Sequence, residues 1–373
     1  MFCNGGEPTK SEKLNSRKTP LYDIHIGLGA RMINFSGWLM PVQYDSIIKE
    51  HEAVRTNVGV FDISHMGEFL LNGNDVIEFL QYIMINDLNL LEVSKGQYSC
   101  MCYENGTVVD DLVYYEEKED LFRMIVNAGN IEKDLQWLNK HIKDKDVKVQ
   151  DLSSMRSRLA FQGPKADDLL QPLLDVNLSE INRFYFKHCN LNGLPIFIAR
   201  TGYTGEKGFE ISFNKDNSKE IWNSLVNTGA IPAGLGARDS LRLEACYSLY
   251  GHEISDKITP IEAGLNWLVK SKEGIEYIGK HILMKQKIQG TERTLVGLNL
   301  LDKGIIRENY KIFKDGNEIG YVTSGGFSPT LKKTIGLGLI KKYHKEVGTE
   351  VEIEIRGKLL KAIVVATPFY RNV

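Results

Sequence analysis

Two adjacent carboxylates stand in a segment that otherwise has the pattern of a β-strand. Asp110 and Asp111 interrupt the apolar and aromatic residues of 108–115, where carboxylates are disfavoured. Period-two alternation puts the two side chains on opposite faces, so one can meet a hydrogen-bond donor while the other points into a pocket. In the alternative interpretation, one carboxylate caps a backbone turn and the other is an exposed charge at a sheet edge. The pattern leaves both interpretations open and does not choose between the two residues.

A glycine-rich segment at 200–210 combines backbone freedom with aromatic and charged groups. Gly202, Gly205 and Gly208 recur at three-residue intervals around Tyr203, and such a loop lets the backbone approach a ligand closely. Glu210 follows at the start of an apolar run, where a carboxylate can hold a planar heterocycle through paired N–H donors. A tight turn between two strands is the alternative interpretation.

Two arginines four residues apart are predicted to share one face of a helix. Arg238 and Arg242 follow Gly236, and an arginine at a helix start is well placed to reach a carboxylate ligand. This segment alone favours the alternative, a ladder of surface salt bridges. Several aromatic residues could line a site, although each by itself is more typical of a core: Trp38, Tyr98, Tyr203, Tyr247 and Trp267.

Motifs for several other kinds of site are missing from the sequence. Gly27-Leu28-Gly29 lacks the third glycine of the dinucleotide fingerprint, and no G-x-x-x-x-G-K-[ST] phosphate loop occurs. There is no G-x-S-x-G segment to mark a serine hydrolase. The eight histidines include no pair at metal-ligand spacing. We therefore expect no metal, NAD or ATP site.

Hydrophobic periodicity predicts the elements that position these residues. Apolar residues at helical spacing indicate amphipathic helices over 75–84, 131–142, 217–226 and 237–250, the last stopped by Gly251. Alternating segments at 98–103 and 107–115 flank Asn105-Gly106, a dipeptide that readily takes the positive φ angles of a tight hairpin turn. They predict a β-hairpin, continued by a strand over 122–126.

The pattern changes near residue 291 and predicts a separate domain. Six short strand-like segments with little helix indicate an all-β barrel at 295–300, 310–313, 318–323, 336–340, 351–355 and 359–366. The residues before them mix helices and strands, so the fold class is α+β. We expect a flexible tail at 1–16, an α+β region of two interleaved subdomains at 17–290 and a barrel at 291–373.

The composition of the chain limits which kinds of partner and which cellular compartment are expected. The 373 residues carry 46 Lys and Arg against 48 Asp and Glu, so no overall field steers the chain toward nucleic acid or an anionic membrane. No apolar run approaches the roughly 20 residues that span a bilayer. The five cysteines are scattered without a C-x-x-C pair, which indicates a reducing compartment. A small substrate or a protein partner is the expected ligand.

A series of different short motifs extends along nearly the whole chain, from Lys18 to Arg371. They lie at 19–22 (TPLY), 35–44 (FSGWLMPVQY), 58–67 (VGVFDISHMG), 110–112 (DDL), 200–210, 233–239 (AGLGARD), 241–245 (LRLEA), 249–253 (LYGHE), 323–330 (TSGGFSPT) and 368–371 (PFYR). In this order they resemble the glycine cleavage T-protein family. Two positions depart from the family's pattern: Ser36 stands where alanine is usual, and Thr107 where the hairpin usually has a second glycine. Neither replaces a reacting group, but Thr107 bears on the turn next to Asp111.

The resemblance implies a fold and an activity. The fold would be a three-domain, cloverleaf-like arrangement around a central folate channel, with a C-terminal β-barrel domain. The activity would be that of an aminomethyltransferase, with tetrahydrofolate as co-substrate and the lipoylated H-protein as partner. The products would be ammonia, 5,10-methylenetetrahydrofolate and the dihydrolipoyl H-protein. The protein would reside in the cytoplasm of a bacterium or in the mitochondrial matrix of a eukaryote.

The resemblance also assigns roles to individual residues. The family's catalytic aspartate falls on Asp111, the second of the pair. Tyr203 and Glu210 match positions that contact the pterin, and Arg238 matches a folate-site position. Residues that match the channel lining are Met66, Tyr98, Asn127, Tyr247 and Trp267, and Arg371 matches an arginine near the channel mouth.

Three other functions compete with this interpretation. Another folate-dependent enzyme, such as a demethylase of a sulfur or amine compound, would use the same scaffold, but Asp111 within Asp-Asp-Leu favours the aminomethyltransferase. A non-catalytic folate-binding protein of iron-sulfur assembly would keep the scaffold but usually not this whole series of motifs. A structural interaction protein is the third alternative. Folate binding without turnover would favour the non-catalytic alternatives, whereas turnover without H-protein would favour the demethylase.

Overall fold

The chain, seen as a computed structural model, is described over residues 15–271 and 274–372 and divides into two compact units. The first unit holds the described residues up to Val76 with 91–97 and 113–239. The second unit holds 77–90, 98–112 and the described residues from Ser240 onward. Of the predicted tail at 1–16, residues 1–14 lie outside the described part.

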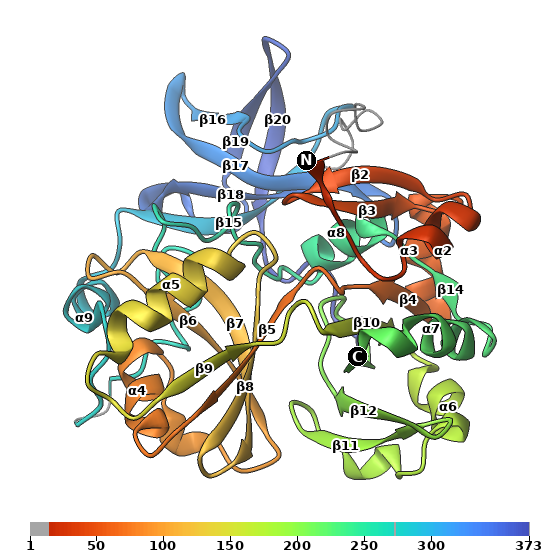
Figure 1. Cartoon of the computed structure of the whole chain (residues 1–373). Coiled ribbons are helices and arrows are strands. Elements are labelled where there is room, and N and C mark those ends of the chain that lie inside the picture. The colour runs from red at the N-terminus through yellow and green to blue at the C-terminus, as the bar shows by residue number, and fades with distance from the viewer. Residues whose placement is uncertain (1–14, 272–273, 373) are drawn as a thin grey trace. The chain divides into compact units, whose positions relative to one another are not determined.

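A six-stranded sheet is the centre of the first unit (Figure 1). Its strands, in order, are β11 (Phe186–Leu191), β12 (Leu194–Ala199), β13 (Gly208–Asn214), β10 (Arg156–Gln162), β4 (Gly59–Asp62) and β14 (Ile231–Pro232). Alternation along β10 and β13 turns Leu159, Phe161 and Ile211 to one face, where they are fully buried against α6 (Ala166–Leu170) and α7 (Ser218–Val226). The opposite face carries Arg158 and Glu210.

A second sheet has the strand order β6-β7-β8-β5-β9. Its strands are β6 (Gly96–Cys102), β7 (Val108–Lys118), β8 (Leu121–Val126), β5 (Gly67–Asn72) and β9 (Lys148–Asp151). Of these, β6 and β7 pass from one unit to the other along the chain. A three-stranded sheet of the first unit is formed by β1 (Arg17–Lys18), β3 (Trp38–Gln43) and β2 (Arg31–Phe35). Ser36, one of the departures from the family pattern, has φ 50° in the two-residue turn that joins β2 to β3.

The predicted hairpin between β6 and β7 turns differently from the expectation. Only Gly106 has a positive φ, 82°, and Asn105 does not. The turn runs from Tyr103 to Gly106, whose N–H donates to the Tyr103 carbonyl at 2.9 Å. Asn105 instead contributes its side chain, which accepts from the backbone N–H of Thr107 at 3.1 Å and from its hydroxyl at 2.7 Å. Thr107 therefore fits this turn and stabilises it.

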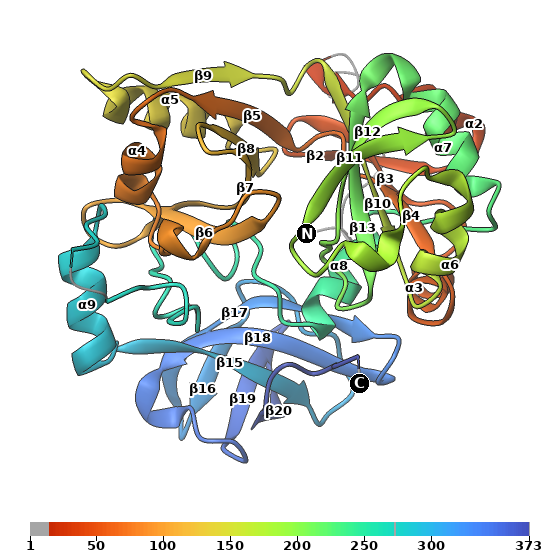
Figure 2. The ribbon, with the colours of Figure 1, turned by 90° about the horizontal axis from the view of Figure 1, so that it is seen from below.

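The second unit contains a closed six-stranded barrel, drawn in blue shades in Figure 1 and seen from a second direction in Figure 2. Its strand order is β15 (Arg293–Leu300), β18 (Lys333–Lys341), β17 (Asn317–Ser328), β16 (Lys311–Lys314), β19 (Glu350–Ile355) and β20 (Lys358–Val365). Inward-facing side chains such as Leu298, Val322 and Ile353 fill it. The predicted α+β class and the C-terminal barrel are confirmed. The cloverleaf-like arrangement around a channel stays a prediction.

The remaining helices are α2 (Tyr22–Gly27), α3 (Ile47–Thr56), α4 (Val76–Ile83), α5 (Ile131–Ile142), α8 (Leu235–Glu244) and α9 (Lys280–Gln289). Of these, α4 and α5 match predicted ones, α8 is shorter than predicted, and α2, α3 and α9 were not predicted. Short 3₁₀ helices lie at Leu88–Leu90, Gln171–Leu173, Leu178–Glu180, Lys215–Asn217 and Lys342–His344. Within residues 15–271 and 274–372, no helix is long and apolar enough to cross a membrane.

The predicted helix over 237–250 was too long, because α8 ends at Glu244. Cys246 has a left-handed φ of 56°, and its N–H donates to the Leu243 carbonyl at 3.1 Å. The next N–H, that of Tyr247, donates to the Arg242 carbonyl at 2.9 Å. These two bonds form a Schellman motif, which ends a helix. The motif usually has glycine at this position, so the sequence pointed instead to Gly251.

Candidate functional site

Asp111 lies on β7 in the second unit and contacts the side chain of Tyr98. The hydroxyl of Tyr98, on β6, donates to Asp111 Oδ2 at 2.8 Å. The Tyr98 ring stacks on Trp267, with ring centroids 6.1 Å apart, and Trp267 is 58% exposed. Asp111 is itself partly exposed, whereas Asp110 is fully buried. The alternation of the strand therefore separates the two carboxylates as predicted, and the structure leaves only Asp111 within reach of solvent.

The other predicted residues of the second unit are placed separately. Tyr247 follows the Schellman motif and is half-buried, and Arg371 is exposed near the C-terminus. Arg242 is buried and pairs with Glu253 at 2.8 Å. It also donates to the hydroxyl of Ser324 at 2.8 Å. The alternative of a surface salt-bridge ladder is thus wrong for Arg242, which is a structural residue of the interior.

In the first unit, the glycine-rich segment forms the loop between β12 and β13, and buried groups hold it in place. The amide of Gln162 donates to the carbonyls of Thr201 and Phe209, at 3.0 and 3.2 Å, and its oxygen accepts from the Thr204 hydroxyl at 3.1 Å. A Cβ on Gly202 would come within 1.9 Å of this oxygen, so only glycine fits there. The loop is therefore both a turn between strands and a rigid support.

Glu210 lies on β13 between two small neighbours. Its cross-strand partners are Ala160 on β10 and Ala199 on β12, whose methyl groups leave room beside the carboxylate. Glu210 Oε2 accepts from the Thr201 hydroxyl at 3.0 Å and lies 4.0 Å from Arg158 Nη1. The side chain is 15% exposed. A carboxylate that is partly exposed and has acceptor capacity left can receive N–H donors from a ligand.

Arg238, at the start of α8, lies over an aromatic ring of the loop. Its guanidinium carbon is 4.6 Å from the ring centroid of Tyr203, a cation–π contact. The structure thus brings Arg238 and Tyr203 together. Met66 and Asn127 are half-buried in the same unit, and Met66 packs against the cluster that contains Phe186 and Phe197.

A buried polar network fixes the segment that leads to Met66. Asp62, at the end of β4, accepts from the Thr19 hydroxyl at 2.6 Å and from the Ser64 N–H at 2.9 Å, and lies 2.9 Å from His25 Nε2. The Tyr44 hydroxyl is 2.9 Å from the other ring nitrogen of His25. Burial raises the pKa of Asp62, but the hydrogen bond and charge of His25 outweigh it and lower this pKa to about 2.

His65 follows this network and is buried without a hydrogen bond at Nδ1. Burial, opposed by Asp62 and assisted by Arg238, lowers the pKa of His65 from 6.5 to about 4. The unfolded chain therefore takes up a proton at higher pH than the folded chain. The stability that neutral His65 provides is complete above pH 6.5 and is lost as the pH falls toward 4.

We expect protonation of His65 to lower the free energy of unfolding by about 3 kcal/mol as the pH falls from 6.5 to 4. Urea unfolding at several pH values gives the free energy of unfolding of the wild type and of His65→Gln. The difference between the slopes of this free energy against pH measures the effect. The variant should have the flatter slope over this window, because its side chain does not titrate. Parallel slopes would show that His65 is not held neutral by the fold.

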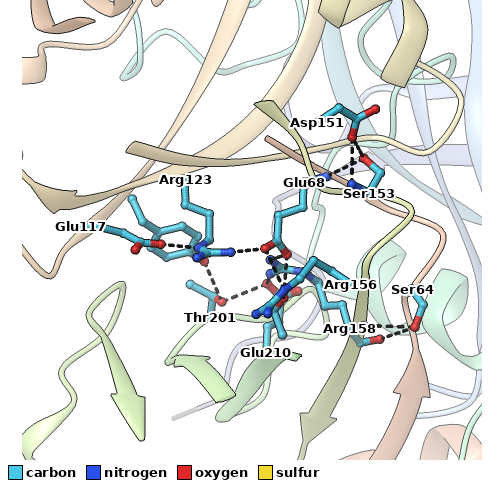
Figure 3. Close-up of polar contacts among 12 residues, drawn as sticks. Ser64, Glu68, Glu117, Arg123, Asp151, Ser153, Arg156, Arg158, Thr201 and Glu210 are labelled. Carbon is cyan, nitrogen blue, oxygen red and sulfur yellow. Dashed lines mark hydrogen bonds and ion pairs between the residues drawn. The ribbon is translucent and has the colours of Figure 1, made fainter. Parts of the chain in front are cut away.

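The chain contains a further charged cluster that the sequence did not reveal. Glu68, on β5, is buried among Arg123, Arg156 and Arg158 (Figure 3). A sequence signal was the pair Arg156 and Arg158, two charged residues on one face of a strand that is otherwise buried. Among residues 15–271 and 274–372, no group of three or more His, Cys, Asp or Glu side chains is arranged to hold a metal ion.

Comparison with known families covers most of the chain. The GCVT N-terminal domain matches residues 21–273, and the glycine cleavage T-protein C-terminal barrel domain matches residues 293–371. The chain belongs to the glycine cleavage T-protein family. The resemblance seen in the sequence motifs is therefore confirmed.

Relatives of this family extend over nearly the full chain. The chain is 51% identical to an aminomethyltransferase of Geobacillus sp. (strain WCH70), over 95% of this chain and 99% of the relative. It is 46% identical to an aminomethyltransferase of Bacillus subtilis (strain 168), over 95% and 99%. The crystal structure of glycine cleavage system aminomethyltransferase T from Bartonella henselae superposes with a TM-score of 0.90, at 35% identity over 95% of this chain and 98% of that one. The chain is an enzyme with aminomethyltransferase activity.

Proposed function

We propose that this aminomethyltransferase moves a one-carbon unit from the lipoylated H-protein to tetrahydrofolate. The donor is the aminomethyl group on the lipoyl arm, and the C–N bond to ammonia breaks. The carbon passes from sulfur to the folate amines, which gives 5,10-methylenetetrahydrofolate, ammonia and the dihydrolipoyl H-protein. Family membership supports this reaction, and the placement of Asp111 is the observation that carries its mechanism.

Asp111 suits a reaction in which positive charge develops on the transferred carbon. Its carboxylate is partly exposed, accepts the Tyr98 hydroxyl at 2.8 Å and lies in the same unit as the exposed Trp267 ring. A fixed carboxylate stabilises a developing cation and can orient or relay protons at the folate nitrogens, effects worth roughly 10²- to 10⁴-fold. Tyr98 holds one carboxylate oxygen in place. Much of the remaining rate enhancement comes from holding the folate N5 and the donor carbon together.

The first unit supplies groups that fit the folate. Glu210 has acceptor capacity left for the paired N–H donors of a pterin, and Arg238 is a cation suited to the glutamate carboxylates of the substrate. Tyr203 supplies an aromatic ring beside Arg238. As the family pattern implies, we assign further folate contacts to Met66, Asn127, Tyr98, Tyr247 and Trp267, and to Arg371 the role of an arginine near the channel mouth.

Replacing Glu210 with alanine should weaken tetrahydrofolate binding by roughly tenfold to a hundredfold. Hydrogen bonds to a charged group are worth about 1.5 to 3 kcal/mol, and the variant loses the paired contact with the pterin. Calorimetric titration of the full chain with tetrahydrofolate measures the change.

Glu206→Ala is not a suitable control, because Glu206 pairs with the buried Arg55 at 2.8 Å. The exposed Lys207 of the same loop is a suitable control. Lys207→Ala should bind tetrahydrofolate with the affinity of the wild type. An unchanged affinity in Glu210→Ala would remove Glu210 from the site.

The nature of the donor separates this function from its closest rival. Turnover should require an aminomethylated H-protein and cease when the H-protein lacks its lipoyl group. A folate-dependent demethylase would instead release its product from a free methylated sulfur or amine compound without H-protein. Formation of the one-carbon folate, measured with each donor, distinguishes the two, and turnover with the free compound alone would overturn the proposed function.

A further inference from the structure

A buried carboxylate of the first unit connects strands β5 and β8 of the five-stranded sheet with strands β10 and β13 of the six-stranded sheet. Glu68, on β5, faces β10 and β13 of the six-stranded sheet (Figure 3). Its Oε2 accepts from Arg158 Nη2 at 3.0 Å and from the Ser212 hydroxyl at 2.6 Å. Its Oε1 accepts from Arg123 and lies 3.3 Å from Arg156 Nε. The carboxylate is therefore engaged on both oxygens by strands of both sheets.

The groups around Glu68 stabilise its ionised form. Burial raises the pKa of Glu68, but the charges of Arg158, Arg123 and Arg156 and the Ser212 hydroxyl outweigh burial and lower this pKa to about 2. Glu68 is thus ionised at any pH at which the enzyme is studied. A buried ionised carboxylate fixes the guanidinium groups that pair with it, since moving either partner leaves an uncompensated charge.

Arg158 is fixed at its backbone as well as at its guanidinium. The Ser64 hydroxyl accepts from the Arg158 N–H at 3.0 Å and lies 3.2 Å from the Arg158 carbonyl. The second terminal nitrogen, Nη1, is buried without a hydrogen-bond partner. It faces Glu210 Oε2 at 4.0 Å. Arg158 therefore stands between two carboxylates, bonded to Glu68 and directed at Glu210.

Glu210 has few other groups to orient it. The Thr201 hydroxyl donates to Oε2 at 3.0 Å, and the cross-strand neighbours Ala160 and Ala199 offer only methyl groups. A single hydroxyl leaves a carboxylate free to rotate about its last side-chain bond. The attraction of Arg158 toward Oε2 fixes that rotation. Neither of these two contacts engages Oε1, and the side chain is 15% exposed.

We propose that Arg158 is a positioning residue for the carboxylate of Glu210, and that Glu68 acts through Arg158 by holding its guanidinium between the two acids. This inference rests on the proposed contact between Glu210 and the pterin. Arg158 and Glu68 do not touch the folate. Their effect is on how well Glu210 is arranged before the folate binds, so it appears in folate affinity more than in the chemical step.

The test is a double-mutant cycle on folate affinity. Arg158→Met should raise the Kd for tetrahydrofolate by about tenfold, because Glu68 and Glu210 then repel each other with no cation between them. In a Glu210→Gln background the same change should raise Kd by less than about twofold. Turnover at saturating folate should fall much less than affinity. A merely structural role for Arg158 would lower affinity equally in both backgrounds.

Two further variants complete the test. Glu68→Gln should weaken folate binding several-fold in the same way, although the Glu68 carboxylate contacts the three arginines and Ser212 and not Glu210. Glu117→Gln is the matched control, because Glu117 contacts Arg123 and His188 and no group bonded to Glu210. It should leave the Kd unchanged. Thermal melting accompanies each titration, so that a loss of fold is not read as a loss of affinity.

Each outcome of the cycle has one meaning. If Glu210→Gln leaves the Kd unchanged, the proposed folate contact fails, and the positioning role fails with it. If Glu210→Gln weakens binding while a folded Arg158→Met binds normally, the contact stands and the positioning role is wrong. Should Arg158→Met not fold, Arg158→Lys keeps the buried charge but cannot reach both acids. It must still raise the Kd, and wild-type affinity in Arg158→Lys would overturn the proposal.

Discussion

Replacing Asp111 with asparagine should lower turnover by about two or more orders of magnitude and leave tetrahydrofolate affinity largely unchanged. The substitution keeps the size of the side chain and its acceptor for the Tyr98 hydroxyl, but it removes the negative charge. A group that stabilises charge only as the reaction proceeds contributes to the transition state and not to binding. The kcat measured with H-protein as donor, together with a calorimetric Kd for folate, separates the two effects.

Asp110 and Tyr98 provide the comparisons for this result. Asp110→Asn should be milder in turnover per folded molecule, because Asp110 is fully buried, whereas its stability should suffer more. Tyr98→Phe keeps the ring on Trp267 and removes only the hydroxyl, so its loss should be smaller than that of Asp111→Asn. Thermal melts must accompany the kinetics. If Asp110→Asn proved the more damaging to kcat, the assignment of the reacting carboxylate would be reversed.

Replacing Arg242 with methionine should lower the free energy of unfolding by about 3 to 5 kcal/mol. Arg242 is 2% exposed and Glu253 is fully buried, and their charged atoms lie 2.8 Å apart. The variant leaves the Glu253 carboxylate in the interior, where the Thr323 hydroxyl and the Leu249 N–H remain as donors. Urea unfolding followed by two independent probes measures the loss and tests whether the transition is two-state.

A double variant and a surface pair make this measurement specific. Arg242→Met combined with Glu253→Gln should be less destabilised than Arg242→Met alone, because no unpaired charge stays buried. Lys311→Met removes an ion pair with Glu318 on the barrel surface, where both side chains are about half exposed, and should change stability little. A loss in Arg242→Met no larger than that in Lys311→Met would contradict the structural role of the buried pair.

The local structure could largely be predicted from the sequence, because hydrophobic spacing reports burial directly. The predicted helix over 131–142 coincides with α5, and each of the six predicted barrel segments overlaps one strand. The helices α2, α3 and α9 were not predicted. Two further errors lie where a residue adopts a backbone conformation unusual for its type or a side chain replaces a backbone conformation in a turn. Cys246, at φ 56°, ends α8 in the place of the expected Gly251. The turn before Thr107 uses the Asn105 side chain instead of a left-handed Asn105 backbone.

The candidate site could be predicted only in part, since its contacts join distant positions. Alternation separated Asp110 from Asp111, but the choice of Asp111 came from the family resemblance. The cluster around Glu68 could not be predicted from spacing: Arg158 is 90 positions from Glu68, and Ser212 is 144 positions away. Only the packing of two sheets brings these side chains together. Each alone looks like an ordinary polar residue of a strand.

The most direct test of the central claim is the formation of 5,10-methylenetetrahydrofolate from glycine. The assay combines the other proteins of a glycine cleavage system, lipoylated H-protein, tetrahydrofolate and the purified chain, with NAD+ as the oxidant that returns the dihydrolipoyl group to its disulfide. With the chain present, methylenetetrahydrofolate and ammonia should form together and in equal amounts. Without it, or with the Asp111→Asn variant, the rate should fall by about two orders of magnitude. Folate binding by the intact chain without any increase in methylenetetrahydrofolate would contradict the account.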